Sequence, residues 1–157
     1  MADLLLATTF RFRVTLTATG GGAELADGAF QECTGLDVEM DVSEIQEGGR
    51  NNAVIQRAGR AKFTRLTLKR GMLHPSDGTV ASDLWGWLQD VVDGVRPIRR
   101  YDGTVLVLGV GERPVATWSF ARGLPAKIVG PQLNARTGEV AVEELQIAHE
   151  GLRMVIR

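Results

Sequence analysis

The chain has 157 residues, 44% of them hydrophobic, which fits one domain with one sizeable core. Its 18 basic and 19 acidic residues nearly cancel, so no overall field favours nucleic acid or an anionic membrane surface. Cys33 is the single cysteine, which excludes an intramolecular disulfide, and the separated His74 and His149 do not have zinc-site spacing. We therefore expect one domain over residues 1–157, without metal or cofactor.

The N-terminal segment lacks the features of an export signal. Leu4 to Leu6 follow an acidic residue, and no basic region or apolar run of signal-peptide length precedes Arg11. No apolar run approaches the roughly 20 residues that span a bilayer. The sequence therefore predicts a soluble intracellular protein.

The first strand is expected over residues 10–18, where apolar and polar residues alternate as in a strand with one buried face. Gly20-Gly21-Gly22 ends it, and Ala26-Asp27-Gly28 gives a second turn signal. A loop or wide hairpin should follow.

A second strand is expected from Leu36 to Val42, in which apolar residues alternate with Asp37, Glu39 and Asp41. One face would then carry three carboxylates and must contact water or a partner. From Glu44 to Gly59 the alternation gives way to a polar, glycine-rich stretch, longer than most connections in a compact domain. Such loops are usually functional or mobile.

Lys62 to Arg70 indicates another strand, and the opposite parity of Phe63 and Leu66 indicates either a bulge or burial on both faces. One helix should begin after Ser82, a plausible N-cap. Its expected apolar stripe, ended by Gly94, is Leu84, Trp85, Leu88, Val91 and Val92.

Trp87 lies off that stripe, so we expect it to cover a sheet edge or to meet a neighbouring subunit.

Residues 105–110 and 115–121 flank the turn cluster Gly111-Glu112-Arg113-Pro114, which predicts a hairpin. A long strand should follow Gly138, and Glu143 within it is expected on a solvated sheet surface. Together the patterns predict a mainly β fold. It is a β-sandwich or barrel of two packed antiparallel sheets, with one short α-helix across an open end or face and an extended loop.

Residue types found in catalytic sites do not converge in this sequence. His74, Ser76 and Asp77 crowd into one turn, and His149 and Glu150 are neighbours that a strand would point to opposite faces. The glycine-rich segments lack the spacing of a phosphate loop. We expect no enzyme and no catalytic residue.

An ordered set of motifs resembles the tail-tube (inner tube) protein family of contractile phage tails and phage tail-like contractile injection systems. In chain order the motifs are Phe12-Arg13-Val14, Phe30 to Leu36, Glu47 to Asn51, Leu66 to Gly71, Leu84 to Trp87, Trp118 before Ala121 to Pro125, and Gly130-Pro131 with Asn134.

This resemblance implies a structural subunit that forms hexameric rings, which stack into a hollow tube for passage of cargo or DNA. The implied partners are the chain itself, a sheath protein, baseplate or tube-initiator and terminal cap proteins, and a cargo or tape-measure protein in the lumen. Assembly would occur in the cytoplasm. The product would be part of a virion tail or a released extracellular particle, with no membrane contact in the resting state.

The resemblance also implies site residues. The stretch from Glu44 to Gly59 corresponds to the family's extended stacking loop, which would reach the next ring and order on assembly. Candidate lumen-facing residues are Asp37, Glu39 and Asp41, and Trp87 is the candidate subunit interface residue. The candidate residues of the ring-stacking loop are Glu44, Glu47, Gly48, Gly49, Arg50, Asn51 and Asn52.

Two alternatives stay open. A tube-initiating or baseplate paralogue would form rings without growing long tubes. A monomeric β-sandwich module would instead bind a sugar or peptide through Trp87 and the glycine loops, and its ligand would raise its stability.

Overall fold

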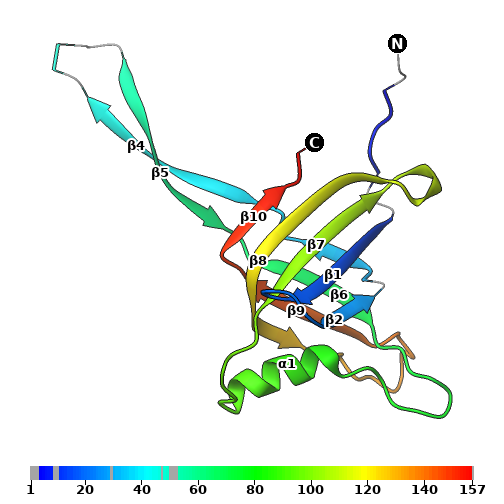
Figure 1. The fold of residues 1–157 in the computed structure, drawn as a ribbon. Helices are drawn as coiled ribbons and strands as arrows, with labels where there is room; N and C mark the ends of the chain where they lie inside the picture. Colours follow the sequence, from blue (N-terminus) through cyan, green and yellow to red (C-terminus); the bar gives the residue numbers. More distant parts are fainter. Residues whose placement is uncertain (1–3, 9–10, 29, 47, 50–52, 157) are drawn as a thin grey trace.

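The computed structural model describes residues 4–8, 11–28, 30–46, 48–49 and 53–156, and it is mainly β with one α-helix (Figure 1). In chain order its elements are β1 (Phe12–Ala18), β2 (Glu24–Gly28), β3 (Glu32–Thr34), β4 (Val38–Gln46), β5 (Val54–Phe63), β6 (Leu66–Gly71), α1 (Asp83–Val92), β7 (Tyr101–Leu108), a 3-10 turn (Val110–Glu112), β8 (Pro114–Val129), β9 (Val142–Ala148) and β10 (Gly151–Met154).

Eight of the strands form one antiparallel sheet in the order β2-β1-β7-β8-β9-β6-β3, and β10 also pairs with β8. The 16-residue β8 joins two halves, because its first part pairs with β7 and β10 while residues 124–129 pair with β9. The edge strands β2 and β3 are consecutive in the chain. The link from Gly28 to Glu32 spans at most about 15 Å, so the sheet must curl until its edges approach each other. The expected mainly β fold of two packed antiparallel layers is confirmed, with β8 shared between them.

The core lies inside this curled sheet. Side chains that are almost completely buried come from both halves, including Val14 and Leu16 on β1, Leu66 and Leu68 on β6, and Leu145 and Ile147 on β9. Within each strand these residues are two positions apart, which is the expected periodicity of one buried face.

A glycine on β7 leaves room for an aromatic ring from β8. A Cβ atom at Gly103 would lie 2.0 Å from the ring of Phe120, which is part of the core. Only the absence of a side chain at Gly103 lets the ring of its cross-strand partner Phe120 occupy this position.

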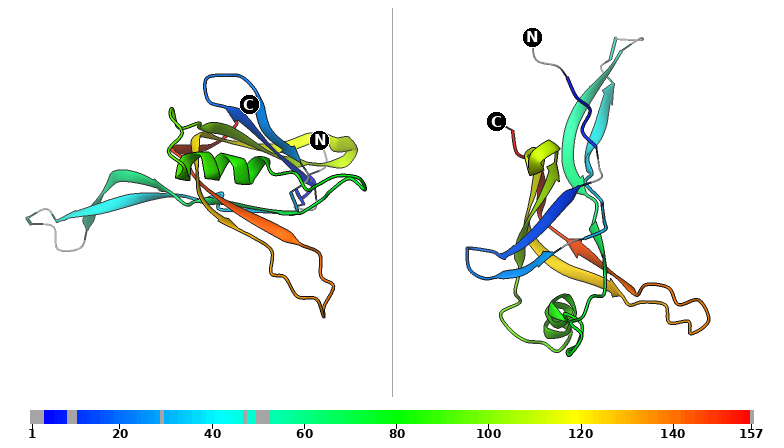
Figure 2. Two further views of the ribbon diagram at one scale, coloured as in Figure 1. Left: turned by 90° about the horizontal axis from the view of Figure 1, so that it is seen from below. Right: turned by 90° about the vertical axis from the view of Figure 1, so that its right-hand side faces the viewer.

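Helix α1 covers one end of the curled sheet (Figures 1 and 2). It begins after Ser82, although the hydroxyl of Ser82 makes no capping hydrogen bond. The turn ends at Gly94, which has φ +80° and donates its N–H to the carbonyl of Val91 at 3.2 Å. Glycine adopts this left-handed conformation without steric cost, so the predicted end of the helix is confirmed.

Two strands expected to be continuous are each divided. The expected strand from Lys62 to Arg70 breaks at residues 64–65, because β5 and β6 belong to different sheets. The expected long strand after Gly138 consists of β9 and β10, separated by a turn at His149 and Glu150. The N–H of Glu150 donates to the carbonyl of Ala121 at 3.0 Å, which fixes this turn against β8.

Candidate interaction surface

Among the strands that the structure describes, β4 and β5 pair only with each other. They form a two-stranded sheet that projects from the body, here called the arm (Figures 1 and 2). This corrects the expected loop from Glu44 to Gly59. Glu44 lies within β4, directly opposite Gln56 on β5, and the pairing extends outward to Gln46 and Val54. Polar residues on both strands of this outer part hid the strand alternation in the sequence.

The turn of the arm is described only at Gly48 and Gly49, and Gly49 has φ +99°. The other residues named for the expected stacking loop, Glu47, Arg50, Asn51 and Asn52, lie outside the described residues.

One face of the arm is apolar near the body. Val38, Met40 and Val42 lie on this face and are 57%, 50% and 59% exposed. Their cross-strand partners are Phe63, Ala61 and Ala58, respectively. Because directly opposed side chains share a face, these six residues form a continuous apolar strip, here called the apolar face.

A bulge in β5 maintains this strip. Met40 pairs with Ala61 and Val42 with Ala58, so two steps along β4 oppose three along β5. A Cβ atom at Gly59 would lie 2.8 Å from the carbonyl oxygen of Asp41, which leaves room only for glycine. The extra residue brings two alanines that are three positions apart to the same side.

The opposite face of the arm is charged. Glu39 pairs with Lys62 and Ser43 with Arg57, and the Nζ atom of Lys62 lies 3.0 Å from Oδ1 of Asp41. Asp37 precedes β4 and is also exposed. The three acidic residues therefore lie at the root of the arm. The alternate apolar residues are also exposed in the single subunit.

The structure places Trp87 in the core rather than at the surface, which corrects the sequence interpretation. Its side chain is 4% exposed, packs edge-on against Tyr101, and donates Nε1–H to the carbonyl of Arg99 at 2.8 Å. Both Leu84-Trp85-Leu88 and Leu84-Trp87-Leu88 have helical spacing, so periodicity alone could not distinguish the two stripes. With almost no exposed area, Trp87 has little to offer a neighbouring subunit or a ligand.

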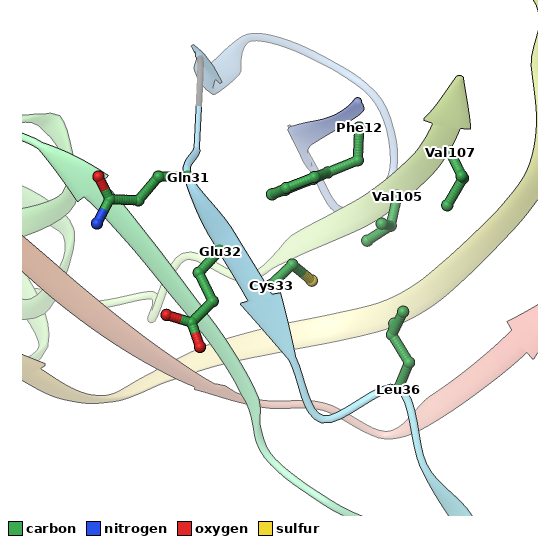
Figure 3. A pocket seen from close by; sticks show the side chains of 7 residues that line it. All are labelled: Phe12, Gln31, Glu32, Cys33, Leu36, Val105 and Val107. Atoms are coloured by element: carbon green, nitrogen blue, oxygen red, sulfur yellow. The ribbon is translucent and has the colours of Figure 1, made fainter. Parts of the chain in front are cut away.

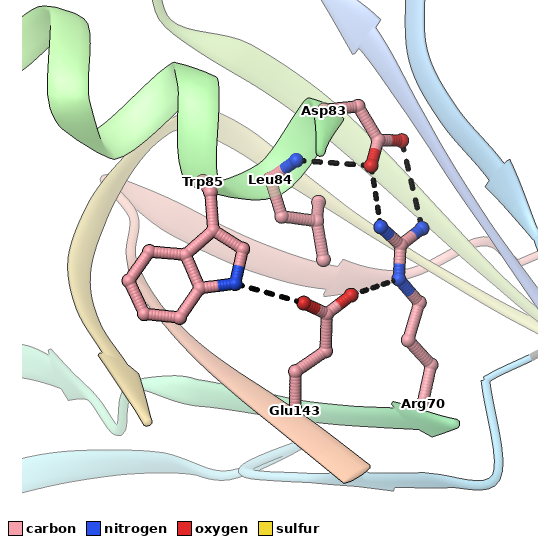
Figure 4. Close-up of polar contacts among 5 residues, drawn as sticks. All are labelled: Arg70, Asp83, Leu84, Trp85 and Glu143. Carbon is pink, nitrogen blue, oxygen red and sulfur yellow. Dashed lines mark hydrogen bonds and ion pairs between the residues drawn. The ribbon is translucent and has the colours of Figure 1, made fainter. Parts of the chain in front are cut away.

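A buried ion cluster fixes the start of α1 to the sheet (Figure 4). Arg70 on β6 donates Nε–H to Glu143 on β9 at 2.5 Å, and its guanidinium also pairs with Asp83 in the first turn of α1. Trp85 donates Nε1–H to the other oxygen of Glu143 at 3.0 Å. Burial acts to lower the pKa of Arg70, but the carboxylates of Asp83 and Glu143 outweigh it and raise the pKa above its usual value.

This cluster corrects the expectation that Glu143 lies on a solvated surface. Its side chain is only 3% exposed, and both carboxylate oxygens have partners. The cross-strand pairing of Arg70 with Glu143 determines this environment, and it becomes visible only once the register of β6 and β9 is known.

A small pocket of about 330 Å³ opens between β3 and the β1–β7 pair (Figure 3). Its lining includes Phe12, Leu36, Val105 and Val107, together with the thiol of Cys33. Burial raises the pKa of Cys33 to about 11, so the thiol stays protonated at neutral pH and is a poor nucleophile.

The turn around His74 has no catalytic geometry. Nδ1 of His74 lies 2.8 Å from the carbonyl oxygen of Pro75, and the N–H of Gly78 donates to that same oxygen at 3.2 Å. Across the ranges that the structure describes, no three potential metal ligands gather, and no helix is long and apolar enough to cross a membrane. We take the arm, with its exposed apolar face, as the candidate interaction surface.

Comparison with known proteins gives a family and a fold. A family model described as T4-like virus tail tube protein gp19 matches residues 8–153. No curated protein sequence matches the chain.

Three solved structures contain chains of similar fold. A chain in the cryo-EM structure of the anti-feeding prophage baseplate is 24% identical, with a TM-score of 0.81, and the match covers 98% of this chain and 97% of that one. For the tube-terminating cap of the anti-feeding prophage, the identity is 18%, the TM-score 0.80 and the coverage 100% and 95%. For the sheath–tube complex of PVC, an extracellular contractile injection system, the identity is 20% and the TM-score 0.75, and the match covers 96% of this chain and 91% of that one.

Proposed function

Because the chain belongs to the T4-like virus tail tube protein gp19 family, we propose that it forms hexameric rings that stack into the hollow inner tube of a contractile tail or injection system. Membership of a tail tube family gives the chain a structural role and not an enzymatic one. The whole of residues 1–157 would act as one tube domain.

The apolar face of the arm carries this proposal. A two-stranded hairpin is at best marginally stable in water, and this one also exposes about half of Val38, Met40 and Val42. Covering those side chains would remove apolar area from water at roughly 25 cal/mol per Å². In a tube, a copy of the chain in the neighbouring ring would supply a surface that covers them. The arm would therefore be the ring-stacking element, with its apolar face against the neighbouring ring.

The two edges of the sheet, at β2 and β3, support the proposed closure of subunits into a ring. Strands β2 and β3 end the strand order, and among the described strands each pairs on one side only. A closed head-to-tail ring in which one subunit's edge meets the next would pair these edges without open-ended growth. Such rings would give the tube a continuous β wall.

The charged face of the arm is the candidate for contact with the water-filled lumen. Asp37 and Glu39 would supply negative charge that repels nucleic acid or acidic cargo, while the ion pair with Lys62 neutralises Asp41. Reversing the charge of Asp37 and Glu39 should then alter cargo loading or passage, and unchanged loading and passage would remove this assignment.

We propose partners for this chain by analogy with the similar structures. Those structures are of a baseplate, a tube-terminating cap and a sheath–tube complex. This chain would meet a baseplate or tube initiator at one end of the tube, a cap at the other, a sheath outside, and a cargo or tape-measure protein inside. It would assemble in the cytoplasm and become part of a virion tail or an extracellular particle.

A tube-initiating paralogue is the second candidate, because the structure with a TM-score of 0.81 is that of a baseplate. This candidate differs from the first in that it would form rings without long tubes. The third candidate, a ligand-binding module, loses its main sequence support because Trp87 is buried.

A matched pair of arm variants tests the stacking role. Met40→Lys places a charge on the apolar face, and Ser43→Lys places the same charge on the opposite, exposed face of the same strand. Negative-stain electron microscopy should show tubes with Ser43→Lys but only separate rings or subunits with Met40→Lys. Tubes of equal length from both variants would contradict burial of the apolar face.

A further inference from the structure

The arm is joined to the body by an aromatic contact that contains a histidine. The ring of His149, in the turn between β9 and β10, lies 5.5 Å from the ring of Phe63 and 5.4 Å from the ring of Phe120, measured between centroids. Phe63 is the last residue of the arm strand β5, and Phe120 belongs to the core of the body. His149 therefore packs between the root of the arm and the core.

Both ring nitrogens of His149 are inaccessible to solvent and lack a hydrogen-bond partner within the described part of the chain. The backbone of Thr64 is near the ring but forms no hydrogen bond of normal geometry. A neutral imidazole tolerates such a site better than an imidazolium ion, which would have to leave water without gaining a partner. Burial accordingly lowers the pKa of His149, and the Thr64 backbone opposes this only in part.

The surrounding charges do not compensate. Glu150 supplies the neighbouring carboxylate, but its Oε2 lies 2.8 Å from Nε of Arg122 and its Oε1 3.7 Å from Arg100. On the arm side, Asp41 is paired with a lysine. The elements next to the ring carry further charged residues, which are Arg57, Arg60 and Lys62 on β5, Arg122 and Lys127 on β8, Glu143 and Glu144 on β9, and Arg153 on β10. The lowered pKa of His149 has burial as its main cause, and no neighbouring charge is needed to account for it.

We propose that His149 is a positioning residue for the arm: as a neutral ring it locks Phe63 onto the core, and on protonation it leaves the contact and releases the root of the arm. The arm would thus be held firmly at neutral pH and loosely in mildly acidic solution, while the curled sheet of the body stays folded.

The direction with pH follows from linkage. The released arm exposes His149 to water, where its pKa returns to about 6.5. Above that value both states hold a neutral ring and the lock is complete. As the pH falls below about 6.5, the released state binds a proton first, and the equilibrium shifts toward release by up to about tenfold for each pH unit. The shift stops once the pH passes the lowered pKa of the locked state.

This proposal goes beyond tube assembly, because it concerns the arm of each subunit and can fail whether or not tubes form. Hydrogen–deuterium exchange of the full-length protein tests it, in dilute solution with the mass checked by light scattering at each pH. The quantity to follow is the exchange of peptides covering β4 and β5 relative to that of a peptide covering β7 in the same sample. This ratio cancels the intrinsic pH dependence of amide exchange.

The chain offers an internal control, since His74 is its only other histidine and is exposed. Between pH 7.5 and 5.5, the ratio should rise several-fold in the wild type and in His74→Gln, and stay constant in His149→Phe. A constant ratio in the wild type would overturn the proposal without any variant. Equal acceleration of the arm and β7 would also overturn it, because the body would then be opening as a whole.

Discussion

Arg70 on β6 and Glu143 on β9 face each other across a strand pair, with side chains that are only 12% and 3% exposed. Asp83 and Trp85 complete the hydrogen bonding of this pair from the first turn of α1. A buried ion pair often adds little net stability, but removing one member leaves an uncompensated buried charge. The pair therefore acts as an attachment point for the helix that covers one end of the sheet.

Glu143→Leu should destabilise the subunit by about 3 to 5 kcal/mol, because the Arg70 guanidinium loses its most buried partner. Urea unfolding followed by tryptophan fluorescence measures this free energy. Glu144→Gln is the matched control, since its side chain points to the other face of the same strand and should change stability by no more than about 1 kcal/mol. An equal decrease in the free energy of unfolding for the two variants would contradict a stabilising role for the Arg70–Glu143 pair.

Gly103→Ala should destabilise the subunit by roughly 1 to 3 kcal/mol, because the added methyl group must displace the core ring of Phe120. Gly86 provides the contrast. It lies within α1 with no atom within 4 Å of an added Cβ, so Gly86→Ala should stabilise by about 0.5 to 1 kcal/mol through helix propensity. Thermal unfolding midpoints of the two variants should therefore move in opposite directions, and a shift of the same sign would contradict the packing of the Phe120 ring on Gly103.

Cys33 should react slowly in the folded protein. A pKa raised from 9.0 to about 11 leaves about a hundredfold less thiolate at pH 8 than in the unfolded chain. Iodoacetamide labelling followed by mass spectrometry should show that difference in rate, and the folded-state rate should keep rising with pH until about pH 11. Equal labelling rates in the presence and absence of urea would contradict the buried environment of the thiol.

Shortening the arm should separate folding from stacking. Val42 and Ala58 are directly opposite, so residues 43–57 can be replaced by an Asn-Gly turn without changing the register below them. We expect the body to keep its unfolding midpoint within a few degrees, because none of the described residues in the removed part belongs to the buried core. Size-exclusion chromatography should show rings at most, and long tubes from this variant would argue against the arm as the stacking element.

The parts of the fold that could be predicted are those in which local chemistry and tertiary packing agree. The alternation in β1 reflects burial of Val14 and Leu16, and a glycine-rich turn does return the chain along β2. The turn cluster after residue 108 joins β7 to β8, and Gly94 follows α1. These signals lie within a few residues of the feature they specify.

The parts that could not be predicted depend on distant residues. The environment of Glu143 is set by Arg70, and that of Trp87 by Tyr101. The outer part of the arm looked like a loop because its strands pair with each other and not with the core. Sequence patterns report burial, so a strand pair that is exposed on both faces gives a weak signal.

Stacked sixfold rings are the central claim. Negative-stain electron microscopy tests it most directly, on the purified protein alone and on the protein coexpressed with the products of its own gene cluster. The account predicts pored rings with sixfold symmetry in end views and hollow cylinders of regular axial repeat in side views. Monomers under every condition would contradict the tube, and rings that never stack would favour the tube-initiating paralogue.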